Sequence, residues 1–150
     1  MEPGGQIEWS SPPSYRLKDI ERDLLEYKDS LDKILNREGF KSLYIGVDPF
    51  NNPREIDLIA QKKYLLMNDN MDKKGSLGKW MMRNTCSIQI NYDIIDEPDI
   101  EELAFILDCI HPITSYLFSN SPFIEKKPNG NLNLRNHIWE NTDSERCRSL

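Results

Sequence analysis

The chain has 150 residues, of which 38% are hydrophobic and 29% charged, a balance typical of a globular domain. Its 19 basic and 25 acidic residues leave a net charge of −6, which argues against a nucleic-acid partner because no global field attracts phosphates. No apolar run reaches the roughly 20 residues needed to cross a bilayer, and the N-terminus lacks a signal-peptide pattern, so we expect a cytoplasmic protein with no membrane partner. Widely separated cysteines predict reduced thiols rather than a disulfide framework or a zinc cluster.

The first third of the chain predicts a strand, a helix and a second strand. Residues 6–10 alternate polar and apolar side chains after a Gly-Gly turn, which is typical of a short strand. Residues 14–37 repeat apolar side chains at helical spacing, and Gly39 follows as a helix stop. Residues 42–47 favour another strand, which an Asp-Pro pair ends.

The middle of the chain predicts a helix, a strand and a second helix. Apolar side chains at spacings of three and four predict a helix over residues 59–71. Residues 85–91 alternate without a break, and they predict a strand within the stretch 81–93. The next helix begins after the capping residue Asp96, continues to about residue 118 and is apolar almost all round, so we expect it to be buried.

These elements together predict a single α+β domain. An alternating strand keeps one face free of helices, so we expect a mostly antiparallel open sheet with helices on one face. Both ends of the sequence look truncated, because the chain opens directly in a dense polar motif and stops in charged residues. We therefore expect residues 1–150 to form an incomplete domain.

Four short polar side chains, Thr85, Ser87, Gln89 and Asn91, share one face of the strand predicted over residues 85–91. One interpretation is the solvated outer face of an antiparallel sheet. The other is a shelf for a small polar ligand, because hydroxyl and amide groups are short, neutral and able to orient such a ligand. The alternation alone leaves both interpretations open.

Several further residues are candidates for ligand binding. Glu2 and Glu8 flank the Gly-Gly turn, and their oxygens are either Mg²⁺ ligands or ordinary exposed acids. The last third is a polar stretch with little periodicity, in which Arg135 can grip a carboxylate or phosphate through two hydrogen bonds. His137 beside Trp139 is equally consistent with a structural pair. Since no glycine-rich phosphate loop occurs, an ATP site would depend on metals and scattered basic residues.

Short motifs follow one another along almost the whole chain: Glu2–Glu8, Tyr64 with Met67 and Met71, Gly75–Gly78, Met81–Met82, Thr85–Asn91, Asn120–Phe123, Lys127–Gly130 and His137–Trp139. In kind and order they resemble the glutamate–cysteine ligases of the plant and proteobacterial type. The resemblance implies a partial ligase catalytic domain over residues 1–150. It also implies a fold like that of glutamine synthetase, in which an antiparallel sheet binds the substrates on its open face.

The same resemblance implies a reaction, its cofactors and a set of site residues. ATP would phosphorylate the γ-carboxylate of glutamate, and the amine of cysteine would displace the phosphate to give γ-glutamylcysteine, the first step of glutathione biosynthesis. The implied cofactors are ATP and Mg²⁺, and the implied small-molecule partners are glutamate, cysteine and ATP. The implied roles are metal binding by Glu2 and Glu8, amino-acid binding by Thr85, Gln89 and Asn91, pocket walls from Tyr64 and Trp139, and contact with a carboxylate or the transferring phosphoryl group by Arg135.

The chain also departs from the family pattern. Relatives usually carry arginine directly before the Thr-Cys pair, whereas here Arg83 is followed by Asn84, and on a strand that shift turns the side chain to the opposite face. Relatives have an upstream acidic strand and a long C-terminal portion, so we expect missing flanking segments or a complementary chain. Two alternatives to this ligase remain: a non-catalytic amino-acid-binding or interaction fragment, and a γ-glutamyl ligase with another amine acceptor.

Overall fold

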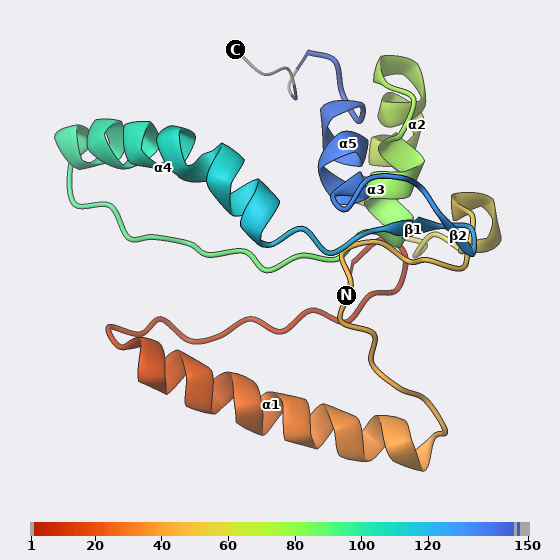
Figure 1. The fold of residues 1–150 in the computed structure, drawn as a ribbon, viewed down its shortest axis with the longest axis horizontal. Helices are drawn as coiled ribbons and strands as arrows, with labels where there is room; N and C mark the ends of the chain where they lie inside the picture. The colour runs from red at the N-terminus through yellow and green to blue at the C-terminus, as the bar shows by residue number, and fades with distance from the viewer. Residues whose placement is uncertain (1, 146, 148–150) are drawn as a thin grey trace. The chain divides into compact units, whose positions relative to one another are not determined.

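A computed structural model describes residues 2–145 and 147 of the chain. Within these residues the protein is mostly helical and contains a two-stranded antiparallel sheet (Figure 1). The chain divides into a unit formed by residues 7–44 and a larger unit formed by Glu2–Gln6 and the described residues from Ile45 onward. None of the described helices is long and apolar enough to span a bilayer.

The smaller unit is built on α1, Leu17–Arg37, which confirms the predicted helix. Gly39, at φ +78°, ends it in the left-handed conformation that glycine adopts without strain. The amide of Gly39 donates to the carbonyl of Asn36 and the amide of Phe40 donates to that of Leu35, which is the Schellman arrangement. Residues 7–16 carry Trp9, whose ring stacks on that of Tyr27 in the helix at a centroid distance of 5.6 Å.

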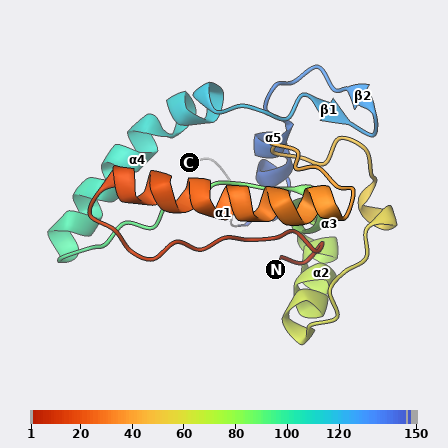
Figure 2. The ribbon, with the colours of Figure 1, turned by 90° about the horizontal axis from the view of Figure 1, so that it is seen from below.

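The larger unit has its core where three helices meet: α2, Lys62–Lys74, α3, Gly78–Asn84, and α5, Leu134–Glu140. In Figure 2 α3 lies between α2 and α5, and it contacts both. The buried side chains of this core belong to Val47, Tyr64, Met82, Leu134 and Ile138. This core is small for a chain of this length, so few residues hold the candidate site in place.

A hairpin with a two-residue turn follows helix α4, Glu97–Leu117, in the stretch that the sequence predicted to be irregular. Strands β1, Phe123–Ile124, and β2, Lys127–Pro128, pair antiparallel around Glu125 and Lys126. Both turn residues have positive φ, 46° and 68°, as a type I′ turn requires. That turn normally uses Asn and Gly, and their absence explains why the sequence did not predict this hairpin.

The strands predicted over residues 6–10, 42–47 and 85–91 are not formed, so the prediction of a broad open sheet is wrong for the described residues, whereas antiparallel pairing is confirmed in β1 and β2. Residues 81–84 belong to α3, not to a strand. A single antiparallel bridge joins Val47 to Thr85, and the amide of Cys86 donates to the carbonyl of Gly46 at 3.0 Å. A strand needs a neighbouring segment to pair with its backbone groups. Residues 42–47 and 85–91 pair with each other only at this bridge, so neither segment forms a strand.

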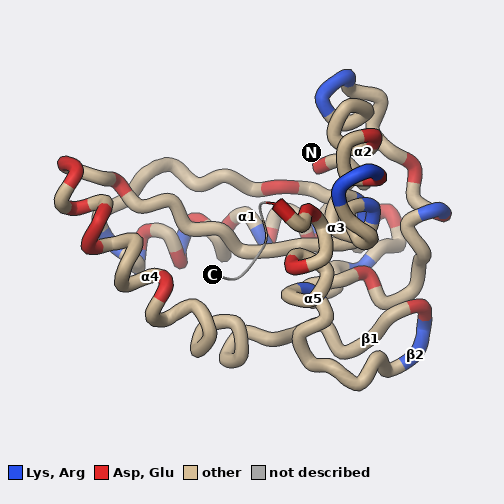
Figure 3. Tube along the Cα trace, turned by 90° about the horizontal axis from the view of Figure 1, so that it is seen from above, with Lys and Arg blue, Asp and Glu red and all other residues tan. Residues whose placement is uncertain are grey.

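Helix α4, Glu97–Leu117, has the predicted limits but not the predicted burial. The Asp96 side chain accepts a hydrogen bond from the amide of Asp99 at 3.0 Å and caps the helix. Figure 3 shows acidic residues gathered in the first turns of α4, where the positive end of the helix dipole favours them. None of its residues is buried, because no other segment of the larger unit packs over its apolar sides.

Candidate functional site

Arg135 lies near the start of α5, at the meeting point of three segments that are distant in the sequence. Its amide donates a hydrogen bond to the hydroxyl oxygen of the buried Ser121 at 3.0 Å, which fixes the backbone of the arginine. A Cβ atom added at Gly46 would lie 3.3 Å from Cδ of Arg135, so the arginine side chain runs over this glycine. The absence of a side chain at Gly46 therefore gives the Arg135 side chain its space.

The guanidinium group of Arg135 is partly withdrawn from water. Burial lowers its pKa, and the neighbouring Cys86 raises it to a lesser degree. Cys86 is an exposed residue, yet partial burial of the thiol raises its pKa more than Arg135 lowers it. A cation in such surroundings attracts an anion more strongly than an exposed one, because less solvent screens it. Arg135 is therefore a candidate for binding a carboxylate or phosphate.

Trp139 lies one helical turn after Arg135 and presents its ring to the guanidinium group. The Cζ atom of Arg135 is 5.5 Å from the ring centroid, within the range of a cation–π interaction. Trp139 is partly buried, and its indole nitrogen is enclosed with no hydrogen-bond partner among the described residues. The two residues that the sequence placed in the site thus form one cluster on the same side of α5, which we name the Arg135 site together with Cys86 and Gly46.

The polar row predicted on the strand is only partly preserved. The Thr85 hydroxyl donates to the carbonyl of Met81 at 2.7 Å, so this side chain closes the end of α3 rather than facing solvent. Gln89 donates to the hydroxyl of Ser87 at 3.5 Å, which keeps these two side chains on one side as the alternation predicts. Gln89 and Asn91 are exposed, and no described contact links them to the Arg135 site.

Tyr64 is buried in α2, with 5% of its surface exposed, and the ammonium group of Lys63 lies 4.5 Å from its ring centroid. It therefore belongs to the helical core in the described structure. Its predicted role as a pocket wall stays a prediction.

The two glutamates predicted to bind a metal are both exposed. Glu2 belongs to the larger unit and Glu8 to the smaller one. Across the described residues, no three His, Cys, Asp or Glu side chains come together as a metal site requires. The described side chains therefore do not by themselves fit a Mg²⁺ ion, which needs several oxygen ligands in octahedral geometry.

Arg83 makes hydrogen bonds to distant segments that the sequence did not predict. Its guanidinium group donates to the carbonyls of Pro53, at 3.0 Å, and Ile56, at 2.8 Å, and to the side chain of Asn68. It thus joins α3 to α2 and to the 3₁₀ turn η1, Pro53–Glu55. Because α3 is a helix, the Arg83–Asn84 order does not send the two side chains to opposite faces, as a strand would. The prediction based on strand geometry is therefore wrong at this point.

The N-terminal motif is attached to the end of α3. Nε2 of Gln6 donates to the carbonyls of Arg83 and Thr85 at 3.1 and 3.2 Å, which would otherwise lack partners at a helix end. Gly4 packs on the backbone of Arg83, since a Cβ atom added there would lie 2.5 Å from its carbonyl oxygen. The Gly-Gly turn was visible in the sequence, but its helix-capping role had no local signal.

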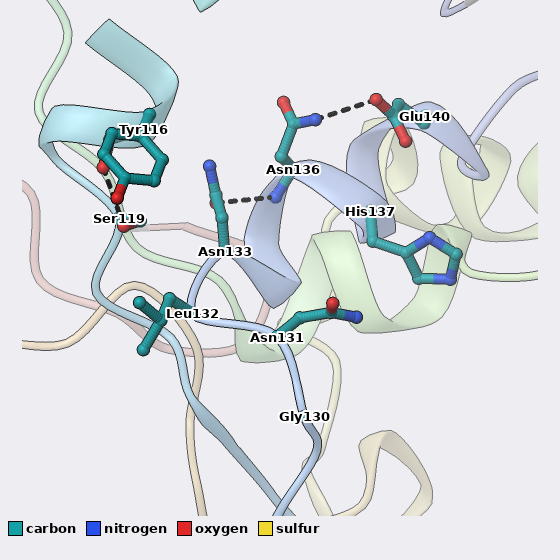
Figure 4. A pocket seen from close by; sticks show the side chains of 9 residues that line it. All are labelled: Tyr116, Ser119, Gly130, Asn131, Leu132, Asn133, Asn136, His137 and Glu140. Atoms are coloured by element: carbon teal, nitrogen blue, oxygen red, sulfur yellow. Dashed lines mark hydrogen bonds between the residues drawn. The ribbon is translucent and has the colours of Figure 1, made fainter. Parts of the chain in front are cut away.

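A separate hollow of about 460 Å³ lies between the end of α4 and α5 (Figure 4). Figure 4 shows Asn136 donating to Glu140, at 2.8 Å, and Asn133 accepting from the amide of Asn136. Asn133 also donates to the carbonyl of Ser115 at 2.7 Å. His137, for which the sequence left a ligand-binding and a structural role open, lines this hollow, whereas Arg135 and Trp139 do not. It is therefore distinct from the Arg135 site.

Comparison with known proteins covers the whole chain. The profile of Glutamate-cysteine ligase family 2 (GCS2) matches residues 1–150. The chain is 36% identical over its full length to the chloroplastic glutamate–cysteine ligase of Arabidopsis thaliana, of which it covers 29%. It is 35% identical to the chloroplastic ligase of Medicago truncatula and 36% identical to ligase A of Oryza sativa subsp. indica. Both matches include all of this chain and 30% of the relative. The chain spans less than a third of the length of these relatives, and it belongs to glutamate–cysteine ligase family 2.

Proposed function

We propose that this chain is part of the catalytic domain of an ATP-dependent glutamate–cysteine ligase, the enzyme of the first step of glutathione biosynthesis. The observation that carries the proposal is the family match across all 150 residues. The Arg135 site supports it, because a partly buried cation beside an aromatic ring suits an anionic amino acid or a phosphoryl group.

The chemistry explains why such a cation is useful. The γ-carboxylate oxygen of glutamate attacks the γ-phosphorus of ATP, which releases ADP and forms an acyl phosphate. The cysteine nitrogen then attacks the acyl carbon, phosphate leaves with the bonding electron pair, and the nitrogen loses a proton as the amide forms. Negative charge develops on oxygens in both steps, and a fixed guanidinium group stabilises it.

Other roles in the proposed ligase depend on completion of the sheet. In the proposal, residues 85–91 become a strand of a glutamine-synthetase-like antiparallel sheet once a neighbouring strand pairs with them. Gln89 and Asn91 then orient the amino acid from its open face, and Tyr64 and Trp139 form pocket walls. The bridge from Val47 to Thr85 supports this arrangement, because it sets the antiparallel direction in which such a sheet would continue.

Mg²⁺ enters the proposal only with residues from outside this chain. The described carboxylates form no cluster, so Glu2 and Glu8 require further acidic ligands from the rest of the ligase.

The test is an assay of ADP release with glutamate and cysteine. We would graft this chain into the Arabidopsis relative in place of the matched segment and compare Arg135→Lys with the surface control Arg22→Lys. Lysine cannot reproduce the bidentate geometry, so we expect Arg135→Lys to raise the KM for glutamate or lower kcat by about tenfold or more. Arg22 lies on the exposed face of α1 and its replacement should change neither constant. No turnover by the soluble graft would refute the enzyme assignment.

A second candidate is a glutamate-binding fragment without catalysis, which the absence of an acidic cluster among the described residues favours. A thermal shift of the isolated chain with glutamate but none with Mg-ATP would support it. Turnover with another amine in place of cysteine would instead identify a different γ-glutamyl ligase. The cytoplasmic location of this chain stays a prediction from its sequence, whereas the relatives from Arabidopsis thaliana and Medicago truncatula are chloroplastic.

A further inference from the structure

The segment that follows Cys86 has the features of a β-strand without its partner. Residues 86–95 are all exposed, and Ile88 and Ile95 retain 92% and 91% of their surface. Within the described residues, the backbone amides and carbonyls of residues 87–94 make no hydrogen bonds. An alternating segment with an unpaired backbone is a template for another strand.

Helix α4 is uncovered in the same way. It has 21 residues and none is buried, although apolar side chains occur on nearly every side of it. Phe105 retains 71% of its surface and Ile113 retains 67%. A helix that is apolar all round is normally enclosed by neighbouring elements, and an exposed apolar surface of this extent marks an interaction site.

We name these two features the uncovered surface, formed by the apolar side chains of residues 88–95 and of α4. We propose that the uncovered surface is the interface for the part of the ligase that lies outside these 150 residues. That part would add a β-strand to residues 87–94 and pack apolar side chains against α4. For the identity of its partner, the proposal rests on the proposed function.

Two observations point to this occupant. The family profile matches the whole chain, yet the chain covers only 29–30% of its relatives, so most of a family member is available to cover the surface. The chain also fixes where the added strand would join, because the bridge between Val47 and Thr85 stops at Cys86 and leaves the following backbone groups unpaired. The first turns of α4 are acidic (Figure 3), so we expect the covering segment to be basic where it contacts them.

The experiment measures amide hydrogen exchange at residues 87–94 and along α4 in two proteins. One is the chain alone, and the other is the Arabidopsis relative carrying this chain in place of its own matched segment. We expect fast exchange in the chain alone and exchange slowed at least about 100-fold in the grafted ligase, because strand pairing and burial protect amides. This measurement needs no substrate, so an inactive graft with protected amides would refute the proposed function and leave the interface standing.

Matched variants locate the interface within the grafted ligase. Ile88→Lys and Phe105→Lys place a charge in the uncovered surface and should reduce the protection by about tenfold or more. Ser87→Lys and Asp108→Lys lie beside them on exposed positions, and we expect them to retain most of the protection. All four residues are exposed in the isolated chain, so the substitutions should leave its own folding unchanged.

Three results would overturn the proposal. Amides 87–94 and α4 that exchange equally fast in the soluble graft would show that the rest of the ligase does not cover them. Equal loss of protection in the lysine variants and their controls would place the contact elsewhere. If the graft is insoluble, the chain is instead co-expressed with the Arabidopsis relative lacking the matched segment, and failure to co-purify, or a homodimer that protects residues 87–94, refutes the assigned partner.

Discussion

Replacement of Arg83 by methionine should loosen the larger unit around residues 53–59. Methionine keeps an unbranched apolar stem and a similar helix propensity, so the change removes mainly the guanidinium hydrogen bonds. Two carbonyl oxygens, those of Pro53 and Ile56, lose their donor. A hydrogen bond to a charged group stabilises a protein by about 1.5 kcal/mol at the low end of its range, and we use this value because Arg83 is only partly buried. The two lost hydrogen bonds therefore lower the local stability by about 3 kcal/mol.

A loss of about 3 kcal/mol corresponds to roughly 100-fold faster hydrogen exchange where exchange reports local opening. The reporting amides are those of Glu55 and Ile56, which donate to the carbonyls of Asn52 and Pro53 at the 3₁₀ turn that Arg83 contacts. The amide of Ile59, which donates to the carbonyl of Pro3, reports on the end of this segment. Mass spectrometry or NMR would follow them in the wild-type chain and in the variant. The larger unit should loosen there first, because its buried core is small.

The matched control is Arg22→Met. Arg22 also bonds carboxylates, those of Asp19 and Asp23, but on the exposed side of α1. Solvent screens such pairs, so we expect no measurable change in the exchange of α1. The reasoning is refuted if Arg83→Met accelerates exchange at Glu55 and Ile56 by less than about threefold, or if Arg22→Met destabilises α1 to a similar extent.

Three further predictions concern the N-terminal Gly-Gly turn, the thiol of Cys86 and helix α4. Gly4→Ala places a methyl group against the backbone of α3, so the N-terminal turn should detach and the amide of Ile59, which donates to this turn, should exchange faster in NMR. Because the pKa of Cys86 is raised, its alkylation rate should increase at higher pH than that of an ordinary thiol. Arg135 lowers this pKa, so Arg135→Gln should move the increase to still higher pH. Iodoacetamide labelling followed by peptide-resolved mass spectrometry would check this, and a shift to lower pH would contradict it. Pro112→Ala should raise the helix content seen by circular dichroism, because proline inside α4 removes a backbone hydrogen bond; unchanged helicity would contradict this.

Much of the helical structure was predictable from local patterns. Residues 14–37 have a regular apolar repeat and Gly39 follows it, and the structure contains α1 and its Schellman end at these places. The limits of α4 follow similarly from its Asp96 cap. Helices form hydrogen bonds within one segment, so a segment carries most of the information about its own limits.

The strands were not predictable in the same way. Residues 85–91 have a clear alternation, yet only Thr85 forms a bridge, and the turn between β1 and β2 lacks the residues that signal it. Alternation indicates which side chains share a face, but a strand forms only when a second segment supplies its hydrogen bonds. The described residues therefore do not form the open sheet predicted from the sequence.

The candidate site divides along the same line. The amino-acid sequence by itself determined the family, because ordered motifs survive as residue types whatever segment they pack against. It also singled out Arg135 and Trp139, which the structure brings together on α5. Only the tertiary structure decided that Cys86 lies beside Arg135, that Gly46 leaves space for its side chain and that Arg83 joins helices. These contacts join residues far apart in the chain, and no local periodicity specifies them.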